Sequence, residues 1–160
     1  MKFRIATLTD LDKITALEHI CFPPNEAASR ESFIKRLEFF PGHFWVLETE
    51  SQLVGFINGM VTDNETIVDE MFADAHLHNE EGKWQSIFGL AVSPDFRNQG
   101  YAGQLIRHFI NKAKEQERAG VTLTCKEYLV PFYEKFGFRD LGVSTSVHGG
   151  AIWHDMTIQF

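Results

Sequence analysis

The chain has 160 residues, 44% hydrophobic and 23% charged, which predicts one globular domain spanning residues 1–160. Its net charge of −7, with no basic stripe, argues against a nucleic-acid-binding protein. Two cysteines without CxxC spacing favour neither a disulfide scaffold nor a zinc site, so we expect no metal. Neither a secretion signal nor a membrane-length apolar run is recognisable, so we expect a cytoplasmic protein that does not bind a membrane.

The first half of the chain predicts two helices set among strands. Expected strands show alternating or β-branched residues, and expected helices carry apolar residues three or four positions apart. In chain order we expect a strand at 2–6, a helix carrying Ile14, Leu17 and Cys21, a helix from its cap Ser29 to Phe40, hairpin strands at 44–49 and 53–61, and an acidic loop with one helical turn at 62–83.

The second half predicts strands that alternate with two further helices. Gly120 is expected to end the longer helix, and His148-Gly149-Gly150 to turn a terminal hairpin. The expected elements are a strand at 84–92, a helix at 100–120, a strand at 121–125, a short helix at 130–136, and hairpin strands at 139–147 and 151–160. This order indicates an α/β (α+β) domain with a mixed sheet between helices.

The segment from Gly89 to Gly103 carries the strongest chemical signal. It predicts a strand, a turn and the start of the long helix, where backbone N–H groups are unpaired and carry partial positive charge. Gly100, Ala102 and Gly103 have little or no side chain to block these groups, so the turn is suited to bind a pyrophosphate. Tight packing of the helix on the sheet would also explain such small residues.

Two segments resemble one known family. The run Arg97-Asn98-Gln99-Gly100-Tyr101-Ala102 is similar to the acetyl-CoA motif Arg/Gln-x-x-Gly-x-Gly/Ala of the GNAT superfamily of N-acetyltransferases. Residues 129–138 (LVPFYEKFGF) and 22–29 (FPPNEAAS) resemble its arylalkylamine N-acetyltransferase branch. The resemblance covers nearly the whole chain. It implies a mixed, largely antiparallel sheet of about six or seven strands flanked by about four helices.

The same resemblance implies an enzyme that transfers acetyl from acetyl-CoA, its co-substrate, to a primary amine. Tyr133 would protonate the departing CoA thiolate, and the Leu90 N–H would hold the thioester carbonyl. Backbone groups of Gly89, Leu90, Ala91 and Val92 would bind the pantetheine arm. The remaining coenzyme-binding positions would be Arg97, Asn98, Gln99, Gly100, Tyr101, Ala102 and Gly103 at the pyrophosphate, together with Phe132.

The general base is the point at which this chain departs from the branch. Vertebrate members carry two histidines on the strand before the motif, where this sequence has Ser86 and Phe88. Phenylalanine cannot relay a proton, so the candidate bases are His78 or its neighbour His76, and Glu26. The alternative is that the histidines are solvated loop residues and that Glu26 stabilises a helix N-terminus.

The acceptor is expected to be a small arylalkylamine or polyamine-like amine. Phe22, Trp84, Ser86 and Phe88 adjoin the motifs and are the expected pocket residues. A peptide N-terminal acetyltransferase is an alternative, although Lys126 and Leu129 stand where that class carries Asn and Ala. A catalytically silent acyl-CoA-binding module is another. The protein is expected to be a monomer or a homodimer.

Overall fold

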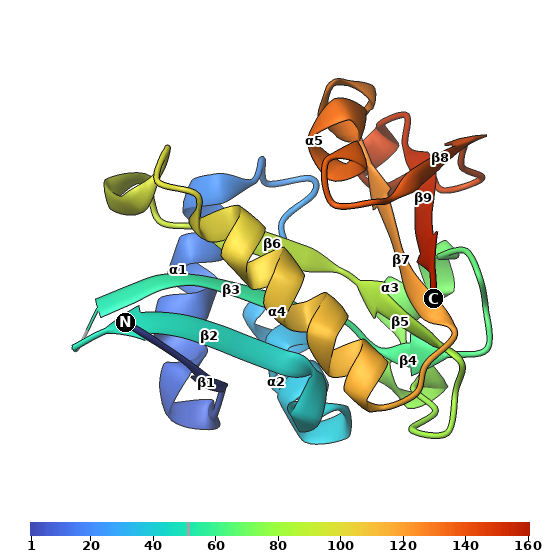
Figure 1. Ribbon diagram of the computed structural model, residues 1–160. Coiled ribbons are helices and arrows are strands. Elements are labelled where there is room, and N and C mark those ends of the chain that lie inside the picture. Colours follow the sequence, from blue (N-terminus) through green and yellow to red (C-terminus); the bar gives the residue numbers. More distant parts are fainter. Residues whose placement is uncertain (51) are drawn as a thin grey trace.

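The computed structural model describes residues 1–50 and 52–160, which form two β-sheets with helices on both faces (Figure 1). The strands are β1 (Lys2–Ile5), β2 (Phe44–Thr49), β3 (Gln52–Asn58), β4 (Val61–Thr62), β5 (Trp84–Ile87), β6 (Gly89–Val92), β7 (Gly120–Cys125), β8 (Arg139–Val143) and β9 (His154–Gln159). The α-helices are α1 (Leu11–Cys21), α2 (Arg30–Phe39), α3 (Asp69–Ala73), α4 (Tyr101–Glu115) and α5 (Val130–Glu134). None of these helices is long and apolar enough to cross a membrane.

The strands divide between the sheets in the orders β1-β2-β3-β6 and β4-β5-β7-β9-β8. All recorded pairings are antiparallel except that of β5 with β7, which is parallel. The expected α/β (α+β) class with a mixed, largely antiparallel sheet is therefore confirmed. Nine strands occur in the described part of the chain because two of the expected strands are each divided.

The division of the expected strand 84–92 lies at Phe88. The N–H groups of Ser86 and Phe88 donate to Met60 and Asn58 at 2.9 and 2.7 Å, whereas the pairing beyond Phe88 is shifted by one residue. Such an extra residue is a β-bulge, which bends a strand and disrupts its ladder. As a result β5 pairs with β7, while β6 pairs with β3 and diverges from β7 (Figure 1). The expected strand 84–92 therefore consists of two strands, β5 and β6, separated by a bulge at Phe88.

The two faces of the central strands are covered by different helices. One face packs against α4 and the other against α1 and α2 (Figure 1). Alternate residues of a strand point to opposite faces, so both sets of strand residues are apolar. Leu47, Val54 and Ile57 pack with Leu105, Ile106 and Phe109 of α4, and Val46 and Phe56 pack with Ile14, Leu17 and Phe33 of the other two helices.

Several expected boundaries need correction. The predicted strand 53–61 divides because β4 joins the second sheet. The segment 62–83 contains α3 and a short 3-10 turn, Ala75–Leu77, in place of one helical turn. The long helix ends at Glu115, after which Glu117 adopts a positive φ of 62°, and Gly120 begins β7 in place of ending the helix. The Ser29 cap is confirmed by a 3.1 Å bond from the Ser32 N–H.

Gly59 marks the point at which the chain passes from the first sheet to the second. A Cβ atom there would overlap the Ser86 carbonyl and lie 3.1 Å from the Ile87 Cα. Both neighbours are backbone, so they cannot move aside as a side chain would. We expect Gly59→Ala to destabilise the protein by about 1–3 kcal/mol in urea unfolding. Gly42→Ala is the control, because open space surrounds Gly42, and equal stability of the two variants would contradict the prediction.

Candidate active site

A cavity of about 440 Å³ lies where β6 and β7 diverge. Its walls come from α1, α2, α3, α5, the ends of β5 and β7, and the loops after α1 and before β9. The residues that matter below are Glu18, Phe22, Glu26, Arg36, Phe72, Phe88, Gly89, Leu90, Cys125, Tyr133, His148 and Trp153. The cavity therefore combines aromatic rings with both signs of charge.

One side of the cavity is the free edge of β6. The Ser93 N–H donates to the Val54 carbonyl at 2.8 Å, so residues in phase with Ser93 face β3. Because backbone groups alternate along an antiparallel strand, the Leu90 N–H is directed away from β3, towards the edge that no other strand covers. A donor in this position can stabilise negative charge on a carbonyl oxygen bound in the cavity.

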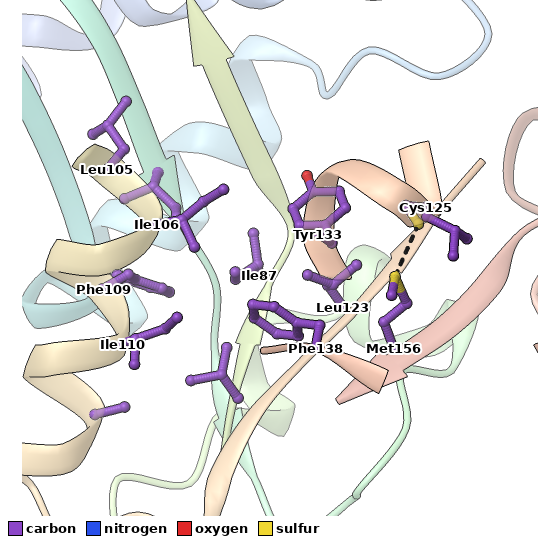
Figure 2. Close-up of a cluster of buried hydrophobic side chains, with 14 of the residues drawn as sticks. Ile87, Leu105, Ile106, Phe109, Ile110, Leu123, Cys125, Tyr133, Phe138 and Met156 are labelled. Carbon is purple, nitrogen blue, oxygen red and sulfur yellow. Dashed lines mark hydrogen bonds between the residues drawn. The ribbon is translucent and has the colours of Figure 1, made fainter. Parts of the chain in front are cut away.

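Tyr133 of α5 lies on the opposite side. Its ring packs against Phe132 and Phe138, and Figure 2 shows its hydroxyl pointing away from the apolar cluster formed with Ile87 and Leu123. No described residue hydrogen-bonds to this hydroxyl, and the side chain lines the cavity. Burial raises the pKa of Tyr133, with smaller contributions from Cys125 and Tyr128. The phenol is therefore protonated at neutral pH and able to donate.

Cys125 of β7 also lines the cavity, but its thiol is a poor nucleophile. Burial, and secondarily the charge of Asp140, raises the pKa of its thiol to about 12. Its Sγ lies 3.5 Å from the Met156 Sδ (Figure 2). A thiol with this pKa supplies little thiolate at neutral pH, so the site lacks the nucleophile for a cysteine-bound intermediate.

The turn before α4 leaves a row of backbone donors free. In the described structure, none of the N–H groups from Asn98 to Gly103 donates a hydrogen bond; the first donor after them is the Gln104 N–H, which bonds to the Gly100 carbonyl at 3.1 Å. Gly100 adopts a positive φ of 81°, which glycine tolerates at little cost, and nothing lies within 4 Å of its missing Cβ. The helix N-terminus is thus open to an anion.

Glu18 of α1 is the least expected residue of the site. It is 5% exposed, its Oε2 accepts the Ala28 N–H at 2.8 Å, and its Oε1 has no partner in the described structure. Burial raises the pKa of Glu18, against the lowering effects of the Ala28 N–H and of the Arg36 charge. A raised pKa makes a carboxylate a stronger base, so Glu18 is suited to accept a proton from a group bound in the cavity.

Arg36 of α2 is a second buried charge at the cavity wall. It is 6% exposed, and its Nη1 donates to the Asn58 Oδ1 at 3.0 Å. The guanidinium lies 5.4 Å from the Phe33 ring centre and 5.1 Å from that of Phe88. Burial lowers the pKa of Arg36 to about 10, partly offset by Glu18, so it is still a cation at neutral pH.

The loop before β9, which includes His148 and Trp153, covers one side of the cavity and forms its roof. Asp69 of α3 accepts hydrogen bonds from the Ser146 hydroxyl and, at 3.1 Å, from the Val147 N–H. His148 stacks on Phe72 and bonds through its Nε2 to the Glu26 carbonyl oxygen at 3.0 Å. These contacts hold the roof against α3 and the loop after α1.

The structure brings some of the expected residues to the cavity and leaves others elsewhere. Phe22, Phe88, Glu26, Gly89, Leu90 and Tyr133 line it. Trp84 and Ser86 do not: Trp84 is buried against Gly120 at the far end of β5, and the Ser86 hydroxyl donates to the Met60 carbonyl at 2.6 Å. Phe132 packs beside Tyr133 without lining the cavity. Glu26 forms a 2.8 Å ion pair with Lys126, which competes with any role as a base.

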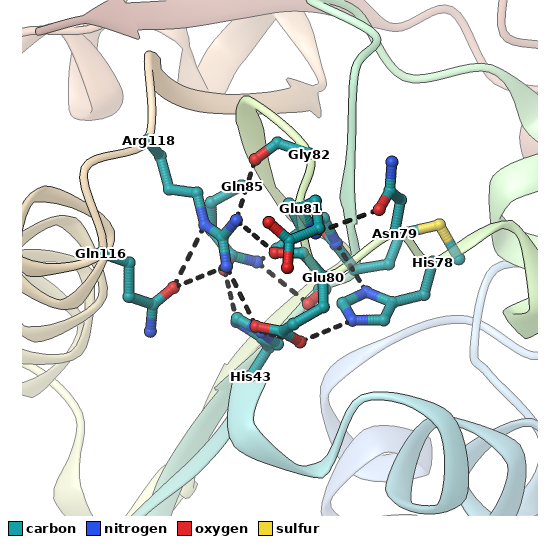
Figure 3. A network of polar contacts seen from close by, with 12 residues as sticks. His43, His78, Asn79, Glu80, Glu81, Gly82, Gln85, Gln116 and Arg118 are labelled. Carbon is teal, nitrogen blue, oxygen red and sulfur yellow. Dashed lines mark hydrogen bonds and ion pairs between the residues drawn. The ribbon is translucent and has the colours of Figure 1, made fainter.

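His78 lies outside the cavity, in a separate polar network with His43, Glu80 and Arg118 (Figure 3). Its Nδ1 accepts the Val61 N–H at 3.0 Å, so in the neutral ring Nε2 carries the proton and donates to Glu80 at 2.9 Å. The expected role of His78 as base therefore has no geometric support. His76 is exposed and bonded to Asp74.

The same network contains the candidate metal ligands of the described structure. The ligand atoms of His43, His78 and Glu80 lie within 4.8 Å of one another. However, an Nε2 that carries a proton has no lone pair for a metal, and the Nδ1 of His78 is already occupied. We interpret the cluster as a structural junction between the loop before β5 and the start of β7.

Glu18 and Arg36 are missing from the sequence-based site, although one signal pointed to them. Both stand at helical spacing on otherwise apolar faces, Glu18 four residues after Ile14 and Arg36 three after Phe33. A charged residue on such a face is a buried-charge candidate. His148 and Trp153 gave no comparable signal, because they reach the cavity only through the folding of the last hairpin.

The split sheet, the cavity at its divergence and the free amides before α4 fit a coenzyme-A-dependent acyltransferase. The sequence profile of the acetyltransferase (GNAT) family matches residues 11–138, and the chain belongs to this family. It is 32% identical over 149 residues to the serotonin N-acetyltransferase of Mesocricetus auratus, covering 81% of this chain and 70% of the relative. The protein is an acetyl-CoA-dependent N-acetyltransferase, as the resemblance implied.

Solved structures share the fold at low sequence identity. The loading GNATL domain of CurA from Lyngbya majuscula matches with a TM-score of 0.85 at 16% identity, covering 99% of this chain and 96% of that domain. The GphF GNAT-like decarboxylase in complex with isobutyryl-CoA matches with a TM-score of 0.82 at 21% identity, covering 99% of both chains. These matches confirm the expected GNAT fold.

The buried carboxyl of Glu18 yields a prediction about pH. Its pKa should lie above the ordinary value of about 4.3, because burial penalises the charged form. The folded state then binds the proton more tightly, so stability is lost as the pH rises from the unfolded pKa through the folded one. We expect Glu18→Gln to gain stability relative to wild type as the pH rises above the unfolded pKa of Glu18. Carbon-13 NMR titration of Glu18 checks the pKa directly, and a value at or below the ordinary one would contradict it.

Proposed function

We propose that the enzyme acetylates a small arylalkylamine by direct attack of the amine on acetyl-CoA. The cavity offers Phe22, Phe72 and Phe88 to an aromatic ring and Glu18 to an ammonium group. The similarity to serotonin N-acetyltransferases supports an amine of this class. The thiol of Cys125 stays protonated and is a poor nucleophile, so it does not form an acyl-enzyme, and this supports direct transfer.

The seat proposed for acetyl-CoA follows the free edge of β6 and the turn before α4. The pantetheine arm would pair with β6, from Gly89 to Val92, in the gap that a strand would otherwise fill. The pyrophosphate would accept hydrogen bonds from the N–H groups between Gln99 and Gly103, which have no acceptor in the described structure. On an acidic protein these backbone donors supply attraction that the overall charge does not.

The proposed proton acceptor for the amine is Glu18. An alkylammonium of pKa about 10.4 must lose a proton before it can attack. Glu18 Oε1 lacks a partner and lies 3.9 Å from the position that a Cβ on Gly89 would occupy, one residue from Leu90. The carboxylate therefore stands next to the strand on which the thioester would lie.

The remaining steps use donors on opposite sides of the cavity. The Leu90 N–H would stabilise the oxyanion of the tetrahedral intermediate, and the Tyr133 hydroxyl would donate its proton to the departing thiolate. The observation that carries the proposal is the convergence of Glu18, Leu90 and Tyr133 on one cavity between β6 and β7.

Tyr133→Phe tests the proposed general acid. We expect kcat with an arylalkylamine such as tryptamine to fall by about 10²–10⁴, because positioned acid catalysis contributes on this scale. The CoA dissociation constant, measured by calorimetry, should change little. Tyr128→Phe is the matched control, since Tyr128 is 75% exposed and lies outside the cavity. Unchanged turnover in Tyr133→Phe would remove this residue from the mechanism.

Ala102→Glu tests the proposed pyrophosphate seat. A carboxylate in the first turn suits the helix dipole, so the fold should persist while the diphosphate is repelled. We expect CoA affinity to fall by about tenfold or more, equivalent to about 1.4 kcal/mol. Gln104→Glu is the control, because its N–H is already bonded to Gly100 and its side chain is exposed. Equal CoA affinity of the two variants would count against this seat.

A further inference from the structure

Two opposite charges are buried at the same cavity without touching each other. Glu18 and Arg36 are 5% and 6% exposed and both line the cavity. In the described structure neither takes part in an ion pair within 4.0 Å. Buried charges are normally paired, because desolvation is costly unless a partner of opposite sign compensates it. The missing partners therefore have to be sought in what the cavity binds.

The guanidinium of Arg36 has hydrogen-bond donors that no described residue accepts. Among the described residues it donates a single hydrogen bond, to Asn58. A guanidinium carries several N–H groups, and two of them can donate parallel hydrogen bonds to one carboxylate. The rings of Phe33 and Phe88 attract the cation but accept no conventional hydrogen bond from its edge. The free N–H groups thus remain available to an anion in the cavity.

Asn58 and Glu18 add an unused donor and an unused acceptor close by. Asn58 is fully buried and its Nδ2 has no acceptor, while Glu18 Oε1 has no donor, within the described residues. The two atoms lie 3.2 and 3.9 Å from one point, the position of a Cβ on Gly89. The unused donor of Asn58 and the unused acceptor of Glu18 therefore lie close to each other, beside Gly89 and the edge of β6.

We infer that the acceptor is a zwitterion, an arylalkylamine that also carries a carboxylate, as in an aromatic α-amino acid. Its ammonium group would meet Glu18, and its carboxylate would meet the free N–H groups of Arg36. Each buried charge would then gain the partner that the protein alone does not provide. This inference rests on the proposed function and narrows its substrate class.

The aromatic part of such an acceptor fits the remaining wall. Phe22, Phe72 and Trp153 line the same cavity as the two charges. A carboxylate on the acyl group of a dicarboxylic acyl-CoA would be a different source of the same anion. We favour the acceptor, because a single molecule then supplies partners for both Glu18 and Arg36.

The test compares kcat/KM for three acceptors with the same side chain: phenylalanine, phenylalaninamide and phenethylamine, each with acetyl-CoA. We expect kcat/KM for phenylalanine to exceed that for the two analogues without a carboxylate by about tenfold or more, because hydrogen bonds to charged groups are the strong ones. In Arg36→Met the ratio of kcat/KM for phenylalanine to that for phenethylamine should fall to about one, whereas Arg30→Met should keep the wild-type ratio. Arg30→Met is the control, being exposed and on the same helix.

The outcomes separate this inference from the proposed function. Acetylation of the amines without a preference for phenylalanine would rule out the zwitterionic acceptor but leave the proposed function standing. An equal loss of kcat/KM for all three acceptors in a folded Arg36→Met would do the same. A preference for phenylalaninamide would indicate a peptide N-terminus instead. An Arg36-dependent preference for succinyl-CoA over acetyl-CoA would show that the carboxylate bound by Arg36 belongs to the acyl group and not to the acceptor, which would overturn the inference. No turnover of any amine by protein that binds CoA would overturn the proposed function itself. The wild-type series decides the matter even if Arg36→Met fails to fold.

Discussion

The site depends on one irregularity, the one-residue shift of pairing at Phe88 that sends β6 away from β7. A continuous strand would hydrogen-bond to both neighbours and leave no room between them. The shift keeps β5 in one sheet and places β6 at the edge of the other. The cavity, the free Leu90 edge and the approach of α5 with Tyr133 all follow from this divergence.

The surrounding structure supports the divergence from both sides. On one face α4 packs against β3, β6 and β7, so it spans the gap and fixes the two sheets relative to each other. On the other face α1 and α2 supply the buried charges Glu18 and Arg36. Placing unpaired charges there lowers stability, and sites that bind charged substrates commonly carry such a cost. The polar junction of His43, Glu80 and Arg118 stabilises the opposite end of the second sheet.

Much of this architecture was predictable from the sequence, because it depends on local periodicity. The helices from Leu11, Arg30 and Tyr101, and the terminal hairpin, follow from apolar spacing and turn residues. The position of the break at Phe88 did not follow, since a shift in pairing depends on the partner strand and leaves no mark in the run 84–92. The resemblance to a family pointed to Leu90 and Tyr133, which do share the cavity, whereas Trp84, Ser86 and His78 were placed by proximity in sequence alone. For Glu18 and Arg36 the sequence showed only that each is a charged residue on an apolar helix face, and it did not indicate the cavity that they line.

The central claim is that the edge of β6 and the turn before α4 form one continuous row of donors for acetyl-CoA. Amide hydrogen exchange, measured residue by residue with and without CoA, tests it most directly. The account predicts slowed exchange at Leu90 and from Gln99 to Gly103, with little change at the amides of β8. Tight CoA binding that left those amides unprotected would contradict it.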